Sequence, residues 1–164
     1  GAAAAAYNAD EKELCRLDEI YSAVKTPFEI RSGSEKVTRR FFKICNNGRE
    51  SFTGLYKSLT EQGICKGHQC IAYGLYMRDN GIELSEGLAV YGYSICSAIV
   101  TNCVKLVPLS QLAGQKILGE SFELISSASE KALFTDINDI GISGAGFDLR
   151  AMQHERLYSR QYMS

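Results

Sequence analysis

Tryptophan is absent from this 164-residue sequence, and proline and histidine each occur only twice. The two histidines, His68 and His154, lie in no recognisable nucleophile motif, so nothing commits the chain to a reaction and we predict that it is not an enzyme. An excess of charge of one sign is also lacking, because the formal net charge is −1 and the pI is about 6.2. Without a basic field, we expect no nucleic-acid partner.

A long uninterrupted hydrophobic run is lacking too. The longest stretch without charged residues, 87–104, is broken by glycine, serine, threonine and asparagine. We interpret this stretch as a buried helix and expect no membrane partner. No positively charged segment precedes an apolar one near the start of the chain, so we expect no secretory signal and a cytoplasmic protein.

The six cysteines are spread over the chain, which favours reduced, buried thiols over a dense disulfide framework. Cys96 and Cys103 are predicted to lie roughly 10 Å apart along one helix, too far for a disulfide. Cys65, His68 and Cys70 resemble a metal cluster. However, four residues separate the two cysteines and a second ligand pair is missing, unlike in structural zinc sites. A small helical metal- or thiol-binding protein that uses these three residues is the alternative interpretation.

The length fits one domain with a substantial core, and 45% hydrophobic with 23% charged residues is typical of globular proteins. Apolar residues recur at helical spacing, for example Leu14, Leu17 and Tyr21, and no stretch alternates cleanly between apolar and polar residues. The predicted fold class is therefore all-α: a single-domain multi-helix bundle with a C-terminal helical tail. Acidic pairs such as Asp18 and Glu19 are expected on exposed faces.

Proline, glycine and residues that cap helices predict the helix boundaries. Helices are expected over 10–26, from Pro27 to 46–48, over 51–62, over 67–79, from Ser85 to 107, from Ser110 to 125, and from Asp148 into the tail. The glycine-rich segment 141–146 is expected to be a loop, since it lacks the context of a phosphate-binding motif. We divide the chain into a placeholder or remnant segment (1–6), a helical bundle (7–147) and a partner-binding tail (148–164).

Two polar stretches suit the recognition of another protein. Around Pro108, a lysine at the end of the longest helix is followed by two glutamines four positions apart. In the tail, arginines and tyrosines form two parallel rows at a spacing of four residues, and both residue types are enriched at interface hot spots. The candidate partner-binding residues are Lys105, Gln111, Gln115, His154, Arg156, Tyr158, Arg160 and Tyr162. No catalytic, cofactor-binding or metal-binding residue is predicted.

The same two stretches resemble signatures of one protein family. Residues 107–111 (VPLSQ) with 114–118 (GQKIL), and residues 151–155 (AMQHE) with 157–160 (LYSR), are similar to two motifs of the urease accessory protein UreF family. Residues 27–31 followed by Ser34, and Gly67-His68 followed by Tyr73-Gly74, agree with further helix starts of that family. The family's N-terminal proline-glycine-serine signature is absent, which implies that the N-terminal part of the family chain is missing here.

The resemblance implies an all-helical homodimer that performs no chemistry itself. Members of the family bind the accessory protein UreD (UreH in some bacteria) and recruit the GTPase UreG, and the assembly delivers nickel to apo-urease. No cofactor is then expected on this chain, and nickel is handled by the complex. By similarity, the tail becomes ordered on partner binding, with Tyr158 and Arg160 as anchors and His154 and Arg156 in support.

Overall fold

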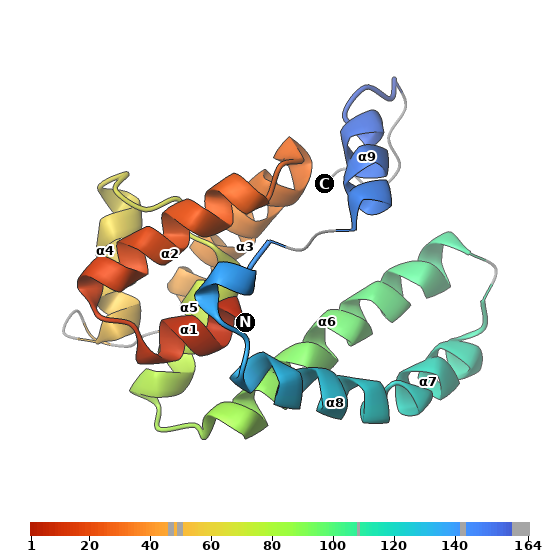
Figure 1. Cartoon of the computed structure of the whole chain (residues 1–164). Coiled ribbons are helices and arrows are strands. Elements are labelled where there is room, and N and C mark those ends of the chain that lie inside the picture. Colours follow the sequence, from red (N-terminus) through yellow and green to blue (C-terminus); the bar gives the residue numbers. More distant parts are fainter. Residues whose placement is uncertain (46–47, 49–50, 108, 142–143, 159–164) are drawn as a thin grey trace.

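The computed structural model describes residues 1–45, 48, 51–107, 109–141 and 144–158. Within these ranges the regular structure is entirely helical, as predicted (Figure 1). The elements are α1 (Ala2–Asn8), α2 (Glu11–Val24), α3 (Phe28–Ile44), α4 (Phe52–Glu61), α5 (Gln69–Asp79), α6 (Leu84–Leu106), α7 (Gln111–Glu120), α8 (Phe122–Leu133), a 3-10 turn η1 (Ile137–Asp139) and α9 (Ala145–His154).

The core lies around α5, against which α1, α3 and α4 pack. Tyr56, Ile71 and Leu75 are fully buried there. At the crossing of α1 and α5, a Cβ atom on Gly74 would lie 2.2 Å from the carbonyl oxygen of Ala3, so the two backbones approach closely only because position 74 has no side chain. Four alanines of the segment expected to be a placeholder are thus buried in the core, namely Ala2, Ala3, Ala4 and Ala6.

Local capping chemistry explains the starts of α2, α4, α6 and α7. Asp10 accepts a hydrogen bond from the Glu13 amide in a complete capping box, and Ser110 caps α7 as predicted. Two predicted caps are wrong. The side chain of Glu83, in place of Ser85, caps α6 by accepting a hydrogen bond from the Glu86 amide. Helix α9 begins at Ala145, before the predicted cap Asp148. The segment 110–125 is also not one helix, because it breaks at Ser121 into α7 and α8.

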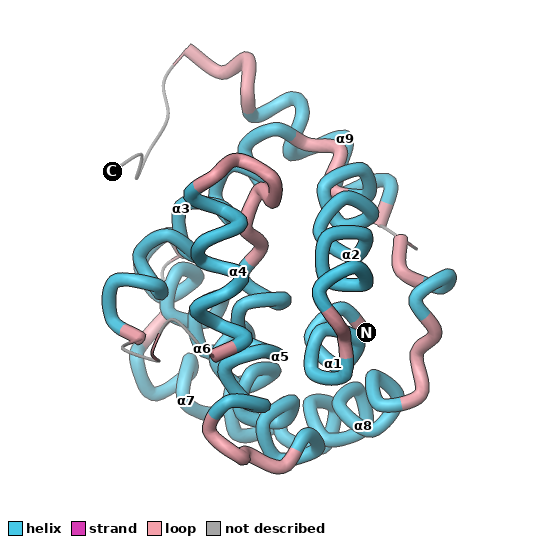
Figure 2. The backbone as a smooth tube through the Cα atoms, turned by 90° about the vertical axis from the view of Figure 1, so that its left-hand side faces the viewer, coloured by secondary structure: helices cyan, strands magenta, loops and turns pink. Residues whose placement is uncertain are grey.

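The prediction that 87–104 forms a buried helix is wrong. The helix exists as α6, but only Gly87 and Leu88 of its residues are buried. α6 leaves the α1–α5 group, α7 turns the chain back, and α8 returns along α6 (Figures 1 and 2). These two short helices cover one side of α6 and leave the other exposed. By length and composition alone, its 23 residues are sufficient to cross a membrane, a weak criterion that core helices also meet.

Candidate partner-binding sites

The first predicted recognition stretch forms a compact site at the elbow between α6 and α7. Lys105 lies at the end of α6, and Gln111 and Gln115 lie on the first turns of α7. All three line one cavity of about 320 Å³, together with Val100, Thr101, Val104 and Gly114. The structure therefore brings together the three residues that the sequence singled out here. Amide and ammonium groups in one small depression can donate hydrogen bonds to carbonyl or carboxylate oxygens of a partner.

The geometry of this elbow depends on a glycine at position 114. A Cβ atom on Gly114 would lie 2.7 Å from Cγ2 of Val104 and 3.2 Å from Cγ1 of Val100. Both valines are β-branched and stiff, so they have little freedom to move aside. Gly114 thus lets α7 approach α6 closely, which holds the two glutamines beside Lys105.

The second predicted stretch, the tail, is held by polar contacts at the start of α3. Nδ1 of His154 lies 2.6 Å from Oε2 of Glu29, and the backbone amide of Phe28 donates a hydrogen bond of 2.9 Å to Oε1 of Glu155. No residue of α9 is buried. His154, predicted to support partner binding, is therefore engaged within the chain itself.

Two predicted tail residues, Arg156 and Tyr158, lie just beyond the end of α9. α9 ends at His154, so Arg156 and Tyr158 lie in the turn and bend that follow, and neither belongs to the helix on which the arginine and tyrosine rows were predicted. Both are exposed, and the side chain of Tyr158 is as accessible as in an extended peptide, at 107%. Arg160 and Tyr162, the other members of those rows, lie outside the described residues.

The two predicted stretches form separate surfaces. α9 lies beside the start of α3, with which it makes contacts, whereas α7 packs on α6 and α8. Both views place α9 and α7 at different ends of the molecule (Figures 1 and 2). A single small ligand cannot touch both sites, but a protein partner can.

The alternative metal cluster does not form. Cys65 packs with its Sγ atom 3.9 Å from that of Cys15, while Nε2 of His68 lies 2.8 Å from the Ser22 hydroxyl. Cys70 is buried with its thiol toward Tyr21. Within the part of the chain that the structure describes, no three His, Cys, Asp or Glu side chains are grouped to hold a metal ion. All six cysteines are free, but only Cys65 and Cys70 are buried.

A buried polar network lies where sequence reasoning expected solvent. Asp18 was predicted to be exposed, yet only 2% of it is accessible. One carboxylate oxygen accepts hydrogen bonds from the Tyr56 hydroxyl (2.5 Å) and the Gly67 amide (3.0 Å), and the other accepts from the Lys66 amide (2.7 Å). The Tyr56 hydroxyl in turn accepts from the His68 amide (2.8 Å). The network fixes the chain as it enters α5.

The environment of this network also lowers the pKa of His68. Its ring is fully buried against Tyr21, and Nδ1 has no hydrogen-bond partner. Burial, chiefly, with the nearby charges of Lys25 and Arg31, lowers the pKa of His68 to about 4, and the Asp18 carboxylate only partly offsets this. The imidazole is therefore neutral at pH 7. In the sequence, the burial of this region was indicated by Leu17 and Tyr21, which lie on the same side of α2. That side of α2 faces His68.

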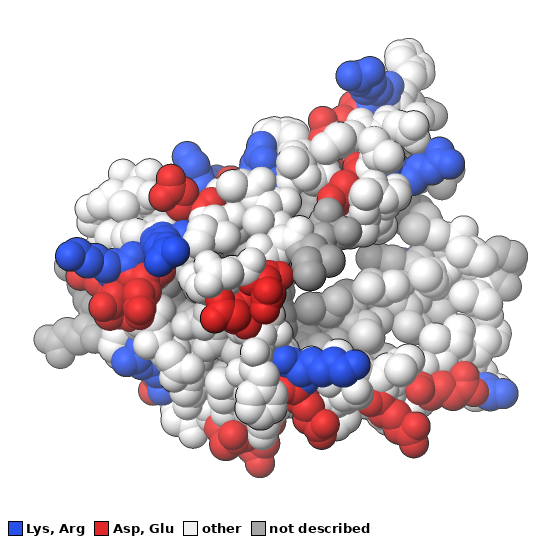
Figure 3. All heavy atoms as spheres, in the orientation of Figure 1, with Lys and Arg blue, Asp and Glu red and all other residues white. Residues whose placement is uncertain are grey.

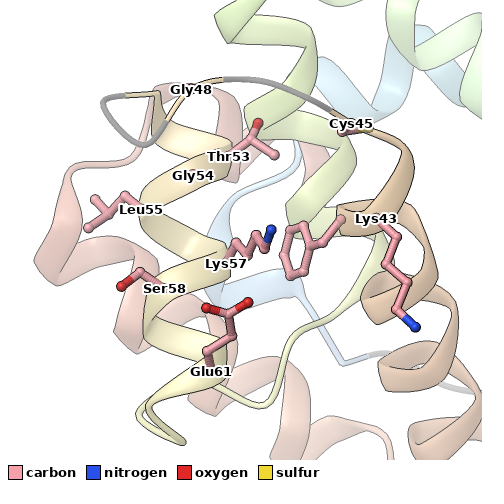
Figure 4. A pocket seen from close by; sticks show the side chains of 10 residues that line it. Lys43, Cys45, Gly48, Thr53, Gly54, Leu55, Lys57, Ser58 and Glu61 are labelled. Atoms are coloured by element: carbon pink, nitrogen blue, oxygen red, sulfur yellow. The ribbon is translucent and has the colours of Figure 1, made fainter.

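A cavity of about 940 Å³ lies between α3 and α4 and contains none of the predicted site residues (Figure 4). Lys57 and Glu61 extend from α4 toward α3, whereas Lys43 points outward (Figure 4). The Thr53 hydroxyl on its wall has no hydrogen-bond partner. No motif in the sequence indicates this cavity, and its mixed charges select no particular ligand.

Comparison with known proteins confirms the resemblance. The sequence model of the UreF family matches residues 1–121. Among curated relatives, the "Urease accessory protein UreF" of Actinobacillus pleuropneumoniae serotype 5b is 34% identical over 158 residues, which cover 96% of this chain and 70% of the relative. The protein of the same description from Haemophilus influenzae is 35% identical over 153 residues, 92% of this chain and 65% of the relative. The chain therefore belongs to the UreF family of urease accessory proteins.

Proposed function

We propose that this non-catalytic urease accessory protein acts in the cytoplasm as a dimeric scaffold. The scaffold binds a UreD/UreH-type protein through its tail, recruits the UreG GTPase and thereby supports nickel insertion into apo-urease. The observation that carries this proposal is the exposure of Arg156 and Tyr158 beyond the docked helix α9. Nickel is the cargo of the assembly. The chain's own Cys65, His68 and Cys70 are each engaged in separate internal contacts, which supports handling of nickel by the complex.

Removal of the tail is expected to abolish assembly and leave the fold intact. Truncation after Leu149 deletes the anchors, whereas no residue of α9 contributes to the core. Arg160→Ala should weaken recruitment of the GTPase at least about fivefold, the loss typical of an interface arginine. The measurement is the mass of complexes formed with UreD- and UreG-type proteins on a sizing column, beside circular dichroism of the variants. Glu130→Ala, on the distant helix α8, serves as the control. Unchanged assembly by the truncated chain contradicts the proposal.

The homodimer is supported by the amount of exposed surface. A compact monomer of 18.1 kDa exposes about 8,100 Å². This chain exposes 10928 Å², about 2,800 Å² more, which is enough for the share that each subunit contributes to a large, permanent interface. In Figure 3 the part of the molecule that holds α6 carries few charges, and acidic side chains gather along the lower edge.

Exposed apolar side chains on α6 support a binding surface for the second copy on this helix. Val90 and Tyr93 on one side of α6, and Ile95 and Ile99 on the other, are each at least 41% accessible, and residues 87–104 contain no charge. Exposed apolar side chains gathered on one helix mark a protein or membrane contact. The glycine, serine, threonine and asparagine residues along α6 favour close approach by a second protein helix over contact with lipid tails. We therefore propose the exposed surface of α6 around Ile99 as the dimer interface.

Ile99→Glu is expected to convert the dimer to a monomer. An unpaired carboxylate buried in an apolar interface costs several kcal/mol, which weakens association at least about a hundredfold. Sedimentation over a range of concentrations measures the change. Ile64→Glu, an equally exposed isoleucine in the loop between α4 and α5, is the matched control and should remain dimeric. A wild-type chain that stays monomeric at high concentration, or that binds neutral lipid vesicles through α6, contradicts this interface.

A further inference from the structure

Two cysteines that are 50 positions apart in the sequence have their sulfur atoms in contact. Sγ of Cys65, in the loop between α4 and α5, lies 3.9 Å from Sγ of Cys15 on α2. Both thiols are free. Cys65 is only 2% accessible, whereas Cys15 is partly accessible, so a reagent in solution can reach one member of the pair. The proposed function makes no use of this contact.

The contact lies at one end of a row of contacts between α2 and the same loop. Cys15, Asp18 and Ser22 follow one another at spacings of three and four residues, so they lie on one side of α2. The amides of the two residues after Cys65 donate to the Asp18 carboxylate, over 2.7 and 3.0 Å. Nε2 of the next residue, His68, lies 2.8 Å from the Ser22 hydroxyl. These contacts fix the position of Cys65 relative to Cys15.

A covalent bond between the two sulfurs requires only local movement. A disulfide joins sulfur atoms at about 2.05 Å, so the two must come about 1.9 Å closer. A change of χ1 by one staggered rotamer moves a cysteine sulfur by about 3 Å. The loop that carries Cys65 also contains Gly63 and Gly67, whose positive φ angles of 77° and 88° are conformations that glycine adopts without strain. A small shift of the loop can therefore complete the approach while the helices stay in place.

We propose that Cys15 and Cys65 are a site of reversible oxidation, at which a small disulfide such as glutathione disulfide converts the two thiols to an intramolecular disulfide. The Cys15 thiolate attacks one sulfur of the oxidant, whose S–S bond breaks and releases one thiolate. The Cys65 thiolate then attacks the Cys15 sulfur of this mixed disulfide and releases the second thiolate. The oxidant gains the two electrons, and its two thiolates take up the two protons that the cysteines lose.

Accessibility and burial assign the order of the two steps. Burial, with the nearby Asp18 carboxylate and Cys15, raises the pKa of the Cys65 thiol, so Cys65 is the poorer first nucleophile. It reacts once the mixed disulfide has placed an activated sulfur beside it. Under reducing conditions both cysteines remain thiols.

The bond is expected to stabilise the fold. It closes a loop of 50 residues and ties α2 to the segment that leads into α5, which restricts the unfolded chain. The site is independent of the proposed scaffold function, because it requires no partner protein.

Oxidation of the purified, folded chain by glutathione disulfide tests the site. Trypsin cleaves after lysine and arginine, so the new bond should join the peptide 13–16 to the peptide 58–66, as identified by mass spectrometry. The thermal midpoint of the oxidised chain should rise by about 5–10 °C. Both changes should be reversed by dithiothreitol.

Cysteine variants supply the controls. Cys15→Ser should give neither the linked peptides nor the rise in the thermal midpoint. Cys45→Ser removes another partly accessible cysteine, at the end of α3, and should retain both. The peptide map of the wild-type chain needs no variant, so it decides the question even if a variant fails to fold.

Three results on the wild-type chain contradict the proposal. They are a mixed disulfide of Cys15 with glutathione that persists, the absence of any reaction at Cys15, and bonds that join Cys15 or Cys65 to other cysteines. None of these measurements involves a partner protein, so a failure here leaves the proposed function untouched.

Discussion

Asp18→Ala is expected to lower the free energy of unfolding by about 3–5 kcal/mol, the largest effect of any single substitution considered for this chain. The substitution removes a buried carboxylate that accepts from Tyr56, Lys66 and Gly67. Three donors are then left in a space closed to solvent, and each buried donor without a partner costs about 1–3 kcal/mol. The Tyr56 hydroxyl, which also accepts from the His68 amide, loses its orientation as well.

Urea unfolding followed by circular dichroism measures this loss. Asp18→Asn is expected to fall between wild type and alanine, because it keeps one acceptor oxygen but places an amide group among donors. Glu19→Ala, the exposed neighbour on α2, is the matched control and should change the free energy of unfolding by no more than about 0.5 kcal/mol. If Asp18→Ala lowers the free energy of unfolding by no more than the control does, the buried network is not present.

Mild acid is expected to destabilise the protein through His68. Its pKa in the folded state is about 4, against 6.5 for an ordinary histidine, so between these values the unfolded chain binds more protons than the folded one. Stability therefore falls as pH drops from about 7 toward 4, by about 3 kcal/mol in total for this residue. The physical cause is the burial of the imidazole, whose charged form has no water and no acceptor at Nδ1.

The free energy of unfolding at pH 7, 6 and 5 tests this expectation. His68→Gln should lower stability at pH 7, since the contact with Ser22 changes, but should flatten the dependence on pH. The chain has only one other histidine, His154, so His154→Gln is the natural control and should retain most of the slope. If the free energy of unfolding of His68→Gln depends on pH as strongly as that of the wild type, the effect is due to carboxylates instead.

Helix type and most helix positions were predictable because their causes are local. The apolar spacing in α2, the Asp10 capping box and the Ser110 cap act within one or two turns, so they can be read from a short window of sequence. The elbow site was predictable for the same reason, since Lys105, Gln111 and Gln115 lie on adjacent helix ends. The two misplaced caps differ from the predictions by only a few residues, where several polar residues compete.

Burial was the least predictable property. α6 has the composition of a core helix, but beyond its first turns it packs mainly on α7 and α8, and much of its surface stays exposed. Aspartate is a residue type that usually lies on the surface, but the hydrogen-bond donors that Asp18 meets in the interior come from 38 to 49 positions away. Whether a side chain is buried depends on which elements cover it, and a sequence window contains no information on distant elements.

The sequence alone determined that this chain is a helical protein of the UreF family without a reaction of its own, because composition, periodicity and short motifs are properties of neighbouring residues. Only the tertiary structure decided what those residues do. It separated the elbow from the tail, turned His154 and Glu155 inward to the start of α3, and left one face of α6 uncovered. Each of these outcomes depends on contacts, or on their absence, between segments that are far apart in the chain. Such contacts are determined by packing and by the need to satisfy polar groups, not by the local sequence pattern.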